Sequence, residues 1–194
     1  MLRPEDYLAA PLEEFVAAIS SHEATPGGGA VAALGAAMAA GLTAMAASFS
    51  EDLLEDAASI RLEAEAIGFR TEQLAARDAL AYQDVLAAMG RAKEDPGRRR
   101  AVTEALEAAS EIPLRVVEEA QRVNELALVL FEAGNRNLRG DAATAAYFSD
   151  AAARSAAALV RINLIEDEDA RVRRAEQLTA RCALPRFGSE SNTG

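Results

Sequence analysis

The chain has 194 residues, which is enough for one domain with a sizeable hydrophobic core. Its formal net charge is −11, so nucleic acid and anionic membranes are poor partners for the surface as a whole. Alanine is abundant, Trp is absent and aromatic residues make up only 5% of the chain, a composition that favours closely packed helices. The single cysteine, Cys182, excludes an internal disulfide, and the first ten residues lack the apolar core of a signal peptide, so we expect a cytoplasmic protein.

The first predicted elements surround a glycine-rich turn. Residues 11–21 have the apolar spacing of an amphipathic helix. A short loop leads to Thr25-Pro26-Gly27-Gly28-Gly29, and the helix predicted after it, over residues 30–49, is apolar almost all round. About 20 such residues could span a membrane, but Ala and Gly dominate and no second segment of this kind exists, so we expect no membrane partner. A helix without a polar face should instead be buried on every side, at the centre of the fold.

Two long helices are predicted next, over residues 56–90 and 98–132. The break between them is rich in charge and contains Lys93. Pro113 lies inside the second helix, where it should kink the helix and free the carbonyl of Ala109.

The last part of the chain begins with a loop over residues 133–140. Asp141 then looks like the cap or the first residue of another buried, Ala-rich helix that runs to about residue 165. A short charged helix is predicted over residues 166–180, with its acidic start favoured by the helix dipole. Residues 185–194 are typical of a disordered tail.

These elements predict one all-α domain over residues 1–184, an elongated bundle of about six helices around a buried Ala-rich central helix. Two of the helices would span roughly 50 Å at about 1.5 Å per residue. A rod of that shape has a large lateral surface, so we expect a helical homodimer.

The glycine turn has the geometry of an anion site, because its backbone N–H groups are unobstructed at a helix N-terminus. It lacks the Lys-Ser/Thr of a Walker loop and the preceding strand of a dinucleotide fingerprint, so a helix start that merely permits close packing stays open as the alternative. One His and one Cys, with no paired spacing, predict no metal site. We expect His22 to be an ordinary loop residue.

Asp78 and Tyr82 form the first polar group that could carry chemistry. They lie four residues apart, and thus share one helix face, on a stripe that is otherwise apolar. A carboxylate there is costly to bury unless it is paired or its raised pKa is used. The alternative is an ion pair with Arg77 or Arg70 at the helix surface.

The second polar group is the loop Gly134-Asn135-Arg136-Asn137-Leu138-Arg139-Gly140-Asp141. Two amides, two guanidiniums and a carboxylate converge there before a buried helix. Helix capping would explain Asp141, but it does not explain Asn135, Asn137 and Arg139 together.

In their order and spacing, these segments resemble the cyclodeaminase/cyclohydrolase family of folate enzymes, which includes formiminotetrahydrofolate cyclodeaminase and a methenyltetrahydrofolate cyclohydrolase. The resemblance covers about residues 12–164. The matching segments are Leu12-Glu13-Glu14-Phe15, Thr25-Pro-Gly-Gly-Gly-Ala-Val31, Asp78-Ala-Leu-Ala-Tyr82 with Val85, Ile112-Pro113, Gly134-Asn-Arg-Asn-Leu-Arg-Gly-Asp141 and Asn163-Leu164. One departure is Leu159-Val160, where the family tends to have Asn-Val before Ile-Asn.

The resemblance implies an all-helical homodimer that binds folate near the subunit interface. It also implies one of two reactions, cyclisation of 5-formiminotetrahydrofolate with loss of ammonia or hydrolysis of 5,10-methenyltetrahydrofolate to 10-formyltetrahydrofolate. Neither reaction requires a metal or a redox cofactor, so none is expected beyond the tetrahydrofolate substrate. One carboxyl group with a shifted pKa can serve either direction; Asp78 is the first candidate and Asp141 the second.

Tyr82 is expected to orient Asp78 or the pterin, and Asn163 to make a polar contact at the site. The anionic glutamate tail of folate needs positive potential, which Arg136, Arg139, Lys93 and the N–H groups of the glycine turn can supply. The candidate substrate-binding residues are therefore Thr25, Pro26, Gly27, Gly28, Gly29, Tyr82, Lys93, Asn135, Arg136, Asn137, Arg139 and Asn163.

The sequence leaves the choice between deaminase and cyclohydrolase open. It also leaves open a different class, a folate-binding or purely structural helical dimer without catalysis. Asp78, Asn135 and Asp141 argue against that class, whereas Leu159 argues for it.

Overall fold

The structure, a computed structural model, describes residues 2–164 and 169–187, and that part of the chain contains helices, turns and loops but no strand. This confirms the all-α prediction and, for the described residues, the expected number of helices. The α-helices are α1 (Leu12–Ile19), α2 (Gly28–Ser48), α3 (Ala57–Met89), α4 (Arg98–Ala133), α5 (Arg139–Asn163) and α6 (Ala170–Thr179), and two 3-10 helices are η1 (Pro4–Asp6) and η2 (Arg136–Leu138).

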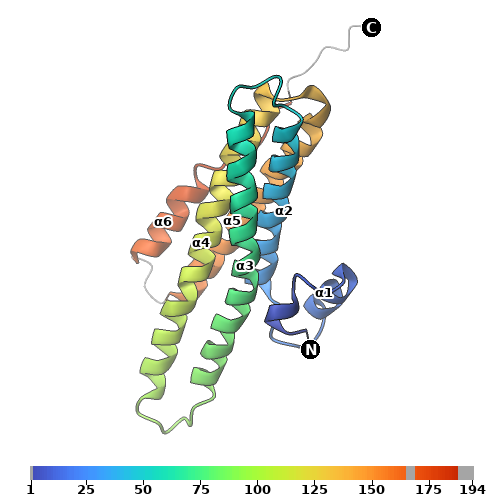
Figure 1. Cartoon of the computed structure of the whole chain (residues 1–194). Helices are drawn as coiled ribbons and strands as arrows, with labels where there is room; N and C mark the ends of the chain where they lie inside the picture. The colour runs from blue at the N-terminus through green and yellow to red at the C-terminus, as the bar shows by residue number, and fades with distance from the viewer. Residues whose placement is uncertain (1, 165–168, 188–194) are drawn as a thin grey trace.

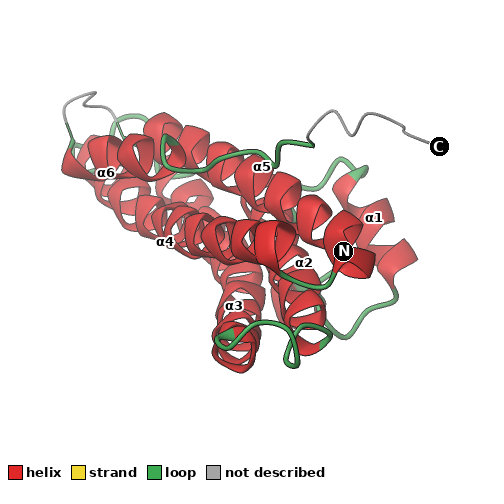
Figure 2. Cartoon of the chain, turned by 90° about the horizontal axis from the view of Figure 1, so that it is seen from above, coloured by secondary structure: helices red, strands yellow, loops and turns green. Residues whose placement is uncertain are grey.

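The four long helices α2 to α5 form the bundle. α2 lies among α3, α4 and α5, while α6 packs against α4 and α5. α3 and α4 make a long hairpin that runs on past the start of α2 and gives the molecule its elongated shape (Figure 1). The view from above shows the long helices grouped together, with α1 set to one side (Figure 2).

Alanine explains how α2 sits so deep in this bundle. Ala33, Ala36 and Ala40 are completely buried, because their small side chains let neighbouring helices approach closely. α2 is also the one described helix that is long and apolar enough to cross a membrane, and 56% of that apolar stretch is buried among its neighbours.

One face of α2 is not covered in the single chain. Val31, Met38, Met45 and Phe49 recur along it at spacings of seven and four residues, and each is between 37% and 60% exposed. The expectation that α2 is buried on every side is therefore wrong for this face. We call these four residues the α2 stripe.

Two local predictions are corrected at the start of α5. The loop before it tightens into the 3-10 helix η2, and α5 begins at Arg139 rather than at Asp141. Asp141 consequently lies in the first turn of the helix and does not cap it. Pro113 lies inside α4, as predicted, and α4 continues through it as one helix from Arg98 to Ala133.

The end of the chain is partly ordered against the bundle. Of the predicted tail, Pro185 is buried and the Phe187 ring lies 5.1 Å, centroid to centroid, from that of Phe131. Residues 188–194 lie outside the described part of the chain, as do residues 166–168 of the predicted acidic helix start. Asp169 caps α6, since its side chain accepts a hydrogen bond of 2.7 Å from the backbone N–H of Arg171.

Candidate active site

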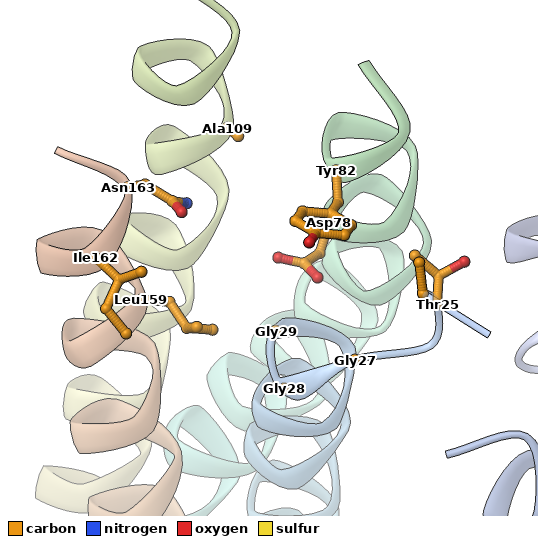
Figure 3. Close-up of a pocket in the computed structure, with 11 residues that line it drawn as sticks. Thr25, Gly27, Gly28, Gly29, Asp78, Tyr82, Ala109, Leu159, Ile162 and Asn163 are labelled. Atoms are coloured by element: carbon orange, nitrogen blue, oxygen red, sulfur yellow. The ribbon is translucent and has the colours of Figure 1, made fainter. Parts of the chain in front are cut away.

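A cavity of about 290 Å³ opens at the N-terminal end of α2, where four helices contribute to its walls (Figure 3). This volume is at the lower end of the range for small-molecule sites. Its described lining residues are Ala24, Thr25, Gly27, Gly28, Gly29, Asp78, Tyr82, Ala109, Leu159, Ile162 and Asn163. The cavity therefore collects the glycine turn, the Asp78 face and the end of α5, which are far apart in the sequence.

Asp78 projects from α3 toward the first turn of α2 (Figure 3). The backbone N–H of Ala30 donates a hydrogen bond to its carboxylate. The N-cap of α2, Gly27, has no side chain, and the first N–H groups of a helix need acceptors. The anion held by this helix N-terminus is therefore a carboxylate of the protein itself.

The environment of Asp78 shifts its pKa upward, from 3.8 to about 6. Burial is the main cause, because it disfavours the charged form, and the hydrogen bond from Ala30 works in the opposite direction. No basic side chain contributes. Arg70, one of the two alternative ion-pair partners, binds Glu119 instead, with 2.6 Å between Nε and Oε1. A carboxyl group with a pKa near neutrality is suited to acid/base chemistry.

Gly29 is the residue that allows Asp78 this close to the helix. A Cβ built on Gly29 would overlap the Asp78 carboxyl group, whereas a Cβ on Gly28 would meet nothing within 4 Å. The requirement is one of space, since no described glycine has a positive φ. The close packing that was one alternative for the glycine turn is thus observed, and the group packed there is the carboxyl of Asp78.

The remaining walls are less polar. Tyr82, one helical turn beyond Asp78, is 43% exposed at the cavity, and Asn163 at the end of α5 points its amide toward the space between them (Figure 3). Leu159 and Ile162 make an apolar wall on α5. Leu159, at which this chain departs from the pattern of the family that it resembles, therefore lies in the cavity itself.

Ala109 reaches the cavity from α4 and was not a predicted site residue. Pro113, four positions later, has no N–H to donate to the Ala109 carbonyl. The proline was visible in the sequence as a signal, but only the packing of α4 places Ala109 against the cavity. Pro26 is buried within the glycine turn without lining the cavity.

The loop that carries Asn135, Arg136 and Asn137 does not reach this cavity within one chain. The side-chain amide of Asn135 donates to the Phe49 carbonyl at 3.0 Å, and its backbone N–H donates to the Ser50 hydroxyl at 2.9 Å. Both partners lie at the end of α2, which spans about 30 Å over its 21 residues. The loop and the glycine turn, both expected to bind substrate, therefore do not meet within a single chain, because a continuous helix separates them.

Three other predicted site residues also lie away from the cavity. The Arg139 guanidinium packs over the Phe131 ring, 4.4 Å from its centroid. Asp141 follows it on the first turn of α5 at that same distant end. Lys93 lies in the turn of the α3–α4 hairpin, beyond the end of α3. Asp78 is accordingly the one predicted acid/base residue in the cavity.

Fold and site together define an all-helical domain that holds a buried, unpaired carboxylate against a helix N-terminus in a small cavity. The profile of the formiminotransferase-cyclodeaminase family matches residues 11–182, and the chain belongs to that family.

Two relatives illustrate the range of the family. A methenyltetrahydrofolate cyclohydrolase of Methylorubrum extorquens is 30% identical over 162 residues, which cover 78% of each chain. The crystal structure of a formiminotetrahydrofolate cyclodeaminase from Thermotoga maritima matches with a TM-score of 0.80 at 26% identity, over 89% of this chain and 90% of that one.

The packing at Gly29 yields a first prediction. Gly29→Ala should lower the free energy of unfolding by about 1 kcal/mol, because its methyl group would force the Asp78 carboxyl out of its place against the helix. Gly28→Ala is the matched control and should keep or slightly raise stability, since the added methyl group meets open space and Ala favours helix. Urea unfolding of both variants measures the difference, and equal stabilities would mean that Asp78 does not sit against Gly29.

The raised pKa of Asp78 yields a second prediction. The folded chain binds this proton more tightly than the unfolded chain, so the carboxyl stabilises the fold at low pH and that contribution is lost as the pH rises through about 6. Asp78→Asn keeps an acceptor for Ala30 but has no charge to bury. It should therefore be more stable than wild type by about 3 kcal/mol at pH 8 and by about half as much at pH 5.

Urea titrations between pH 5 and pH 8 test this expectation. Asp84→Asn, an exposed substitution on the same helix, controls for the loss of one negative charge. A stability difference for Asp78→Asn that stays constant with pH would refute the raised pKa.

Proposed function

We propose that the chain is an enzyme of folate one-carbon metabolism that acts on the N5/N10 one-carbon bridge of tetrahydrofolate. Family membership and the activities for which both relatives are named support this substrate class. Within it, the site best supports hydrolysis of 5,10-methenyltetrahydrofolate to 10-formyltetrahydrofolate. The observation that carries this choice is Asp78, a carboxyl group in the cavity without a basic partner, which can take a proton from water. The 30% identity to a methenyltetrahydrofolate cyclohydrolase favours the same reaction.

In this hydrolysis, water adds to the methenyl carbon between N5 and N10, and Asp78 takes a proton from the water. The resulting tetrahedral carbon then collapses to the formyl group, its bond to N5 breaks, and N5 gains a proton. One proton is released overall. Asp78 first accepts a proton and then, as its conjugate acid, can return one to N5, so a single carboxyl group serves both steps.

Cyclodeamination is the second candidate, favoured by the structural match to the Thermotoga maritima protein. N10 attacks the formimino carbon, the five-membered ring closes, and the amine leaves as ammonia after protonation, with one proton taken up overall. Here the protonated form of Asp78 acts first, as the acid for the leaving amine. We propose no cofactor beyond the folate for either reaction, since neither transfers electrons.

The other lining residues have roles in binding. The Tyr82 ring offers a flat apolar surface beside Asp78, and the Asn163 amide can donate to and accept from the polar edge of a pterin. Leu159 and Ile162 provide an apolar surface opposite them, against which the flat face of a pterin can pack.

Two absorbance assays test the proposal. Purified protein is mixed separately with 5,10-methenyltetrahydrofolate and with 5-formiminotetrahydrofolate, and the methenyl absorbance is followed. A fall in the first, above the spontaneous rate, means cyclohydrolase, and a rise in the second means cyclodeaminase. Asp78→Asn should reduce either rate by about 100-fold or more, and no change in either assay with wild type would leave a non-catalytic protein.

The pH dependence of kcat/KM provides a third prediction, which separates the two roles of Asp78. As a base for water, Asp78 must be ionised, so kcat/KM for hydrolysis should fall as the pH drops below about 6. As an acid for ammonia it must be protonated, so kcat/KM for deamination should fall as the pH rises above about 6. A profile that is flat between pH 5 and pH 8 for both substrates would remove Asp78 from the mechanism.

We further propose that the active form is a homodimer in which each site is built from two chains. The cavity of one chain is small, and its described lining includes a carboxylate but no basic side chain for the folate glutamate tail. The α2 stripe runs from Val31, beside the glycine turn, to Phe49, beside the Asn135 loop. An apolar face of this length on the central helix supports burial against a second copy.

A two-fold axis across the α2 stripe would place the two α2 helices antiparallel, so Val31 of one chain would lie near Phe49 of the other. The Asn135 loop of the partner would then lie beside the glycine turn. Arg136 is exposed on that loop, and it would bring positive charge to the mouth of the cavity.

The fourth prediction is that two variants with impaired activity restore activity when they are combined in one dimer. Asp78→Asn and Arg136→Ala should each be impaired, and mixed dimers of the two should regain activity, because one of their two sites contains both wild-type residues. Mixing Asp78→Asn with Gly29→Ala, which damages the same end of the same chain, should restore none. A strict monomer in light scattering, or mixed dimers without regained activity, would contradict the two-chain site.

A further inference from the structure

Tyr7 is a buried tyrosine that lies outside the cavity and has no role in the proposed reaction as described above. It follows η1 and is 4% exposed, and its ring packs edge-on against Phe15, with 5.4 Å between centroids. Its hydroxyl oxygen is buried and makes no hydrogen bond of ordinary geometry in the described part of the chain.

A buried hydroxyl without a partner lowers stability, because it has given up its bonds to water. Phenylalanine would fill the same space against Phe15 without that cost. The oxygen of Tyr7 is therefore unexplained by packing, and this raises the question of which group it serves.

Two neighbours locate this oxygen. Burial raises the pKa of Tyr7, the Thr25 side chain is close enough to oppose that shift, and the charge of Asp78 adds to it. Thr25 lines the cavity, and its hydroxyl oxygen is turned away from Asp78 (Figure 3). The phenol thus lies behind the glycine turn, with Thr25 between it and the cavity.

We propose that Tyr7 is a positioning residue for Asp78. Its hydroxyl lies against the Thr25 side chain and holds the start of the glycine turn, in the free protein as well as with substrate bound. The other end of that turn presents the Ala30 N–H to the Asp78 carboxylate. This inference rests on the proposed function only in taking Asp78 as the acid/base.

Removal of the Tyr7 hydroxyl should raise the pKa of Asp78. The hydrogen bond from Ala30 favours the ionised form of Asp78, so a looser turn weakens the bond and Asp78 holds its proton to a higher pH. Tyr7 from the N-terminal segment and Tyr82 from α3 are the titratable described groups that face Asp78 here. The cavity residues of α2, α4 and α5 are not titratable: Gly28, Gly29, Ala109, Leu159, Ile162 and Asn163.

Tyr7→Phe, which removes one oxygen, is the experiment. We expect an unfolding midpoint that is unchanged or higher and, for hydrolysis, a fall of about tenfold in kcat/KM near pH 6. The part of the pH–rate profile that depends on Asp78, which we call its limb, should shift to higher pH. Thr25→Val should shift the limb in the same direction, and the double variant should add little, because both act through one contact. Tyr147→Phe, on an exposed ring of α5, should change none of these quantities.

A second readout does not depend on activity. The stability difference between Asp78 and Asp78→Asn, measured against pH, reports the pKa of Asp78 directly. In the Tyr7→Phe background that pH dependence should extend to higher pH. If wild type is inactive in both folate assays, the proposed function fails while this readout still decides the role of Tyr7. If wild type is active, and both the pH profile and the stability curve of Tyr7→Phe match it, the role of Tyr7 alone is overturned.

Discussion

The contact between the Asp78 carboxylate and the first turn of α2 is the interaction on which the site depends. It requires a helix start without side chains, because a Cβ on Gly29 would occupy the place of the carboxyl group. It also requires α3 to lie directly against α2, which the alanines of α2 permit. The glycine turn, the small-residue helix and the isolated carboxylate are thus parts of one arrangement.

That arrangement also sets the chemistry of the carboxyl group. Burial alone would keep Asp78 protonated, and a helix N-terminus alone would keep it ionised. The two effects oppose each other, and burial prevails far enough to bring the pKa to about 6. A group poised there can accept a proton or donate one near neutral pH, which suits a family whose members include both a cyclohydrolase and a cyclodeaminase.

Within one chain, the bundle places the two groups of polar candidate residues at opposite ends of α2. The Asp78 carboxyl lies at the start of α2, whereas the cationic, amide-rich loop is held by Asn135 at the end of α2. The α2 stripe that joins the two ends is apolar and exposed. The proposed two-fold packing of this stripe would bring the two ends together. It would account for both the uncovered face of the central helix and the absence of a cation among the described lining residues.

The sequence by itself determined the helical class and most helix bounds to within a few residues. It also singled out Asp78 and the glycine turn, which the structure brings together in one cavity. These features depend on local signals: apolar spacing, Gly and Pro at helix ends, and one carboxylate on an otherwise apolar stripe. Only the tertiary structure decided that Gly29 is a steric requirement of Asp78, that Leu159 and Ala109 line the cavity, and that the loop containing Asn135 and Arg136 lies a full helix length away. Those facts depend on which helices pack side by side and in which direction. The apolar periodicity of a helix shows which of its faces is buried, but not which helix packs against that face.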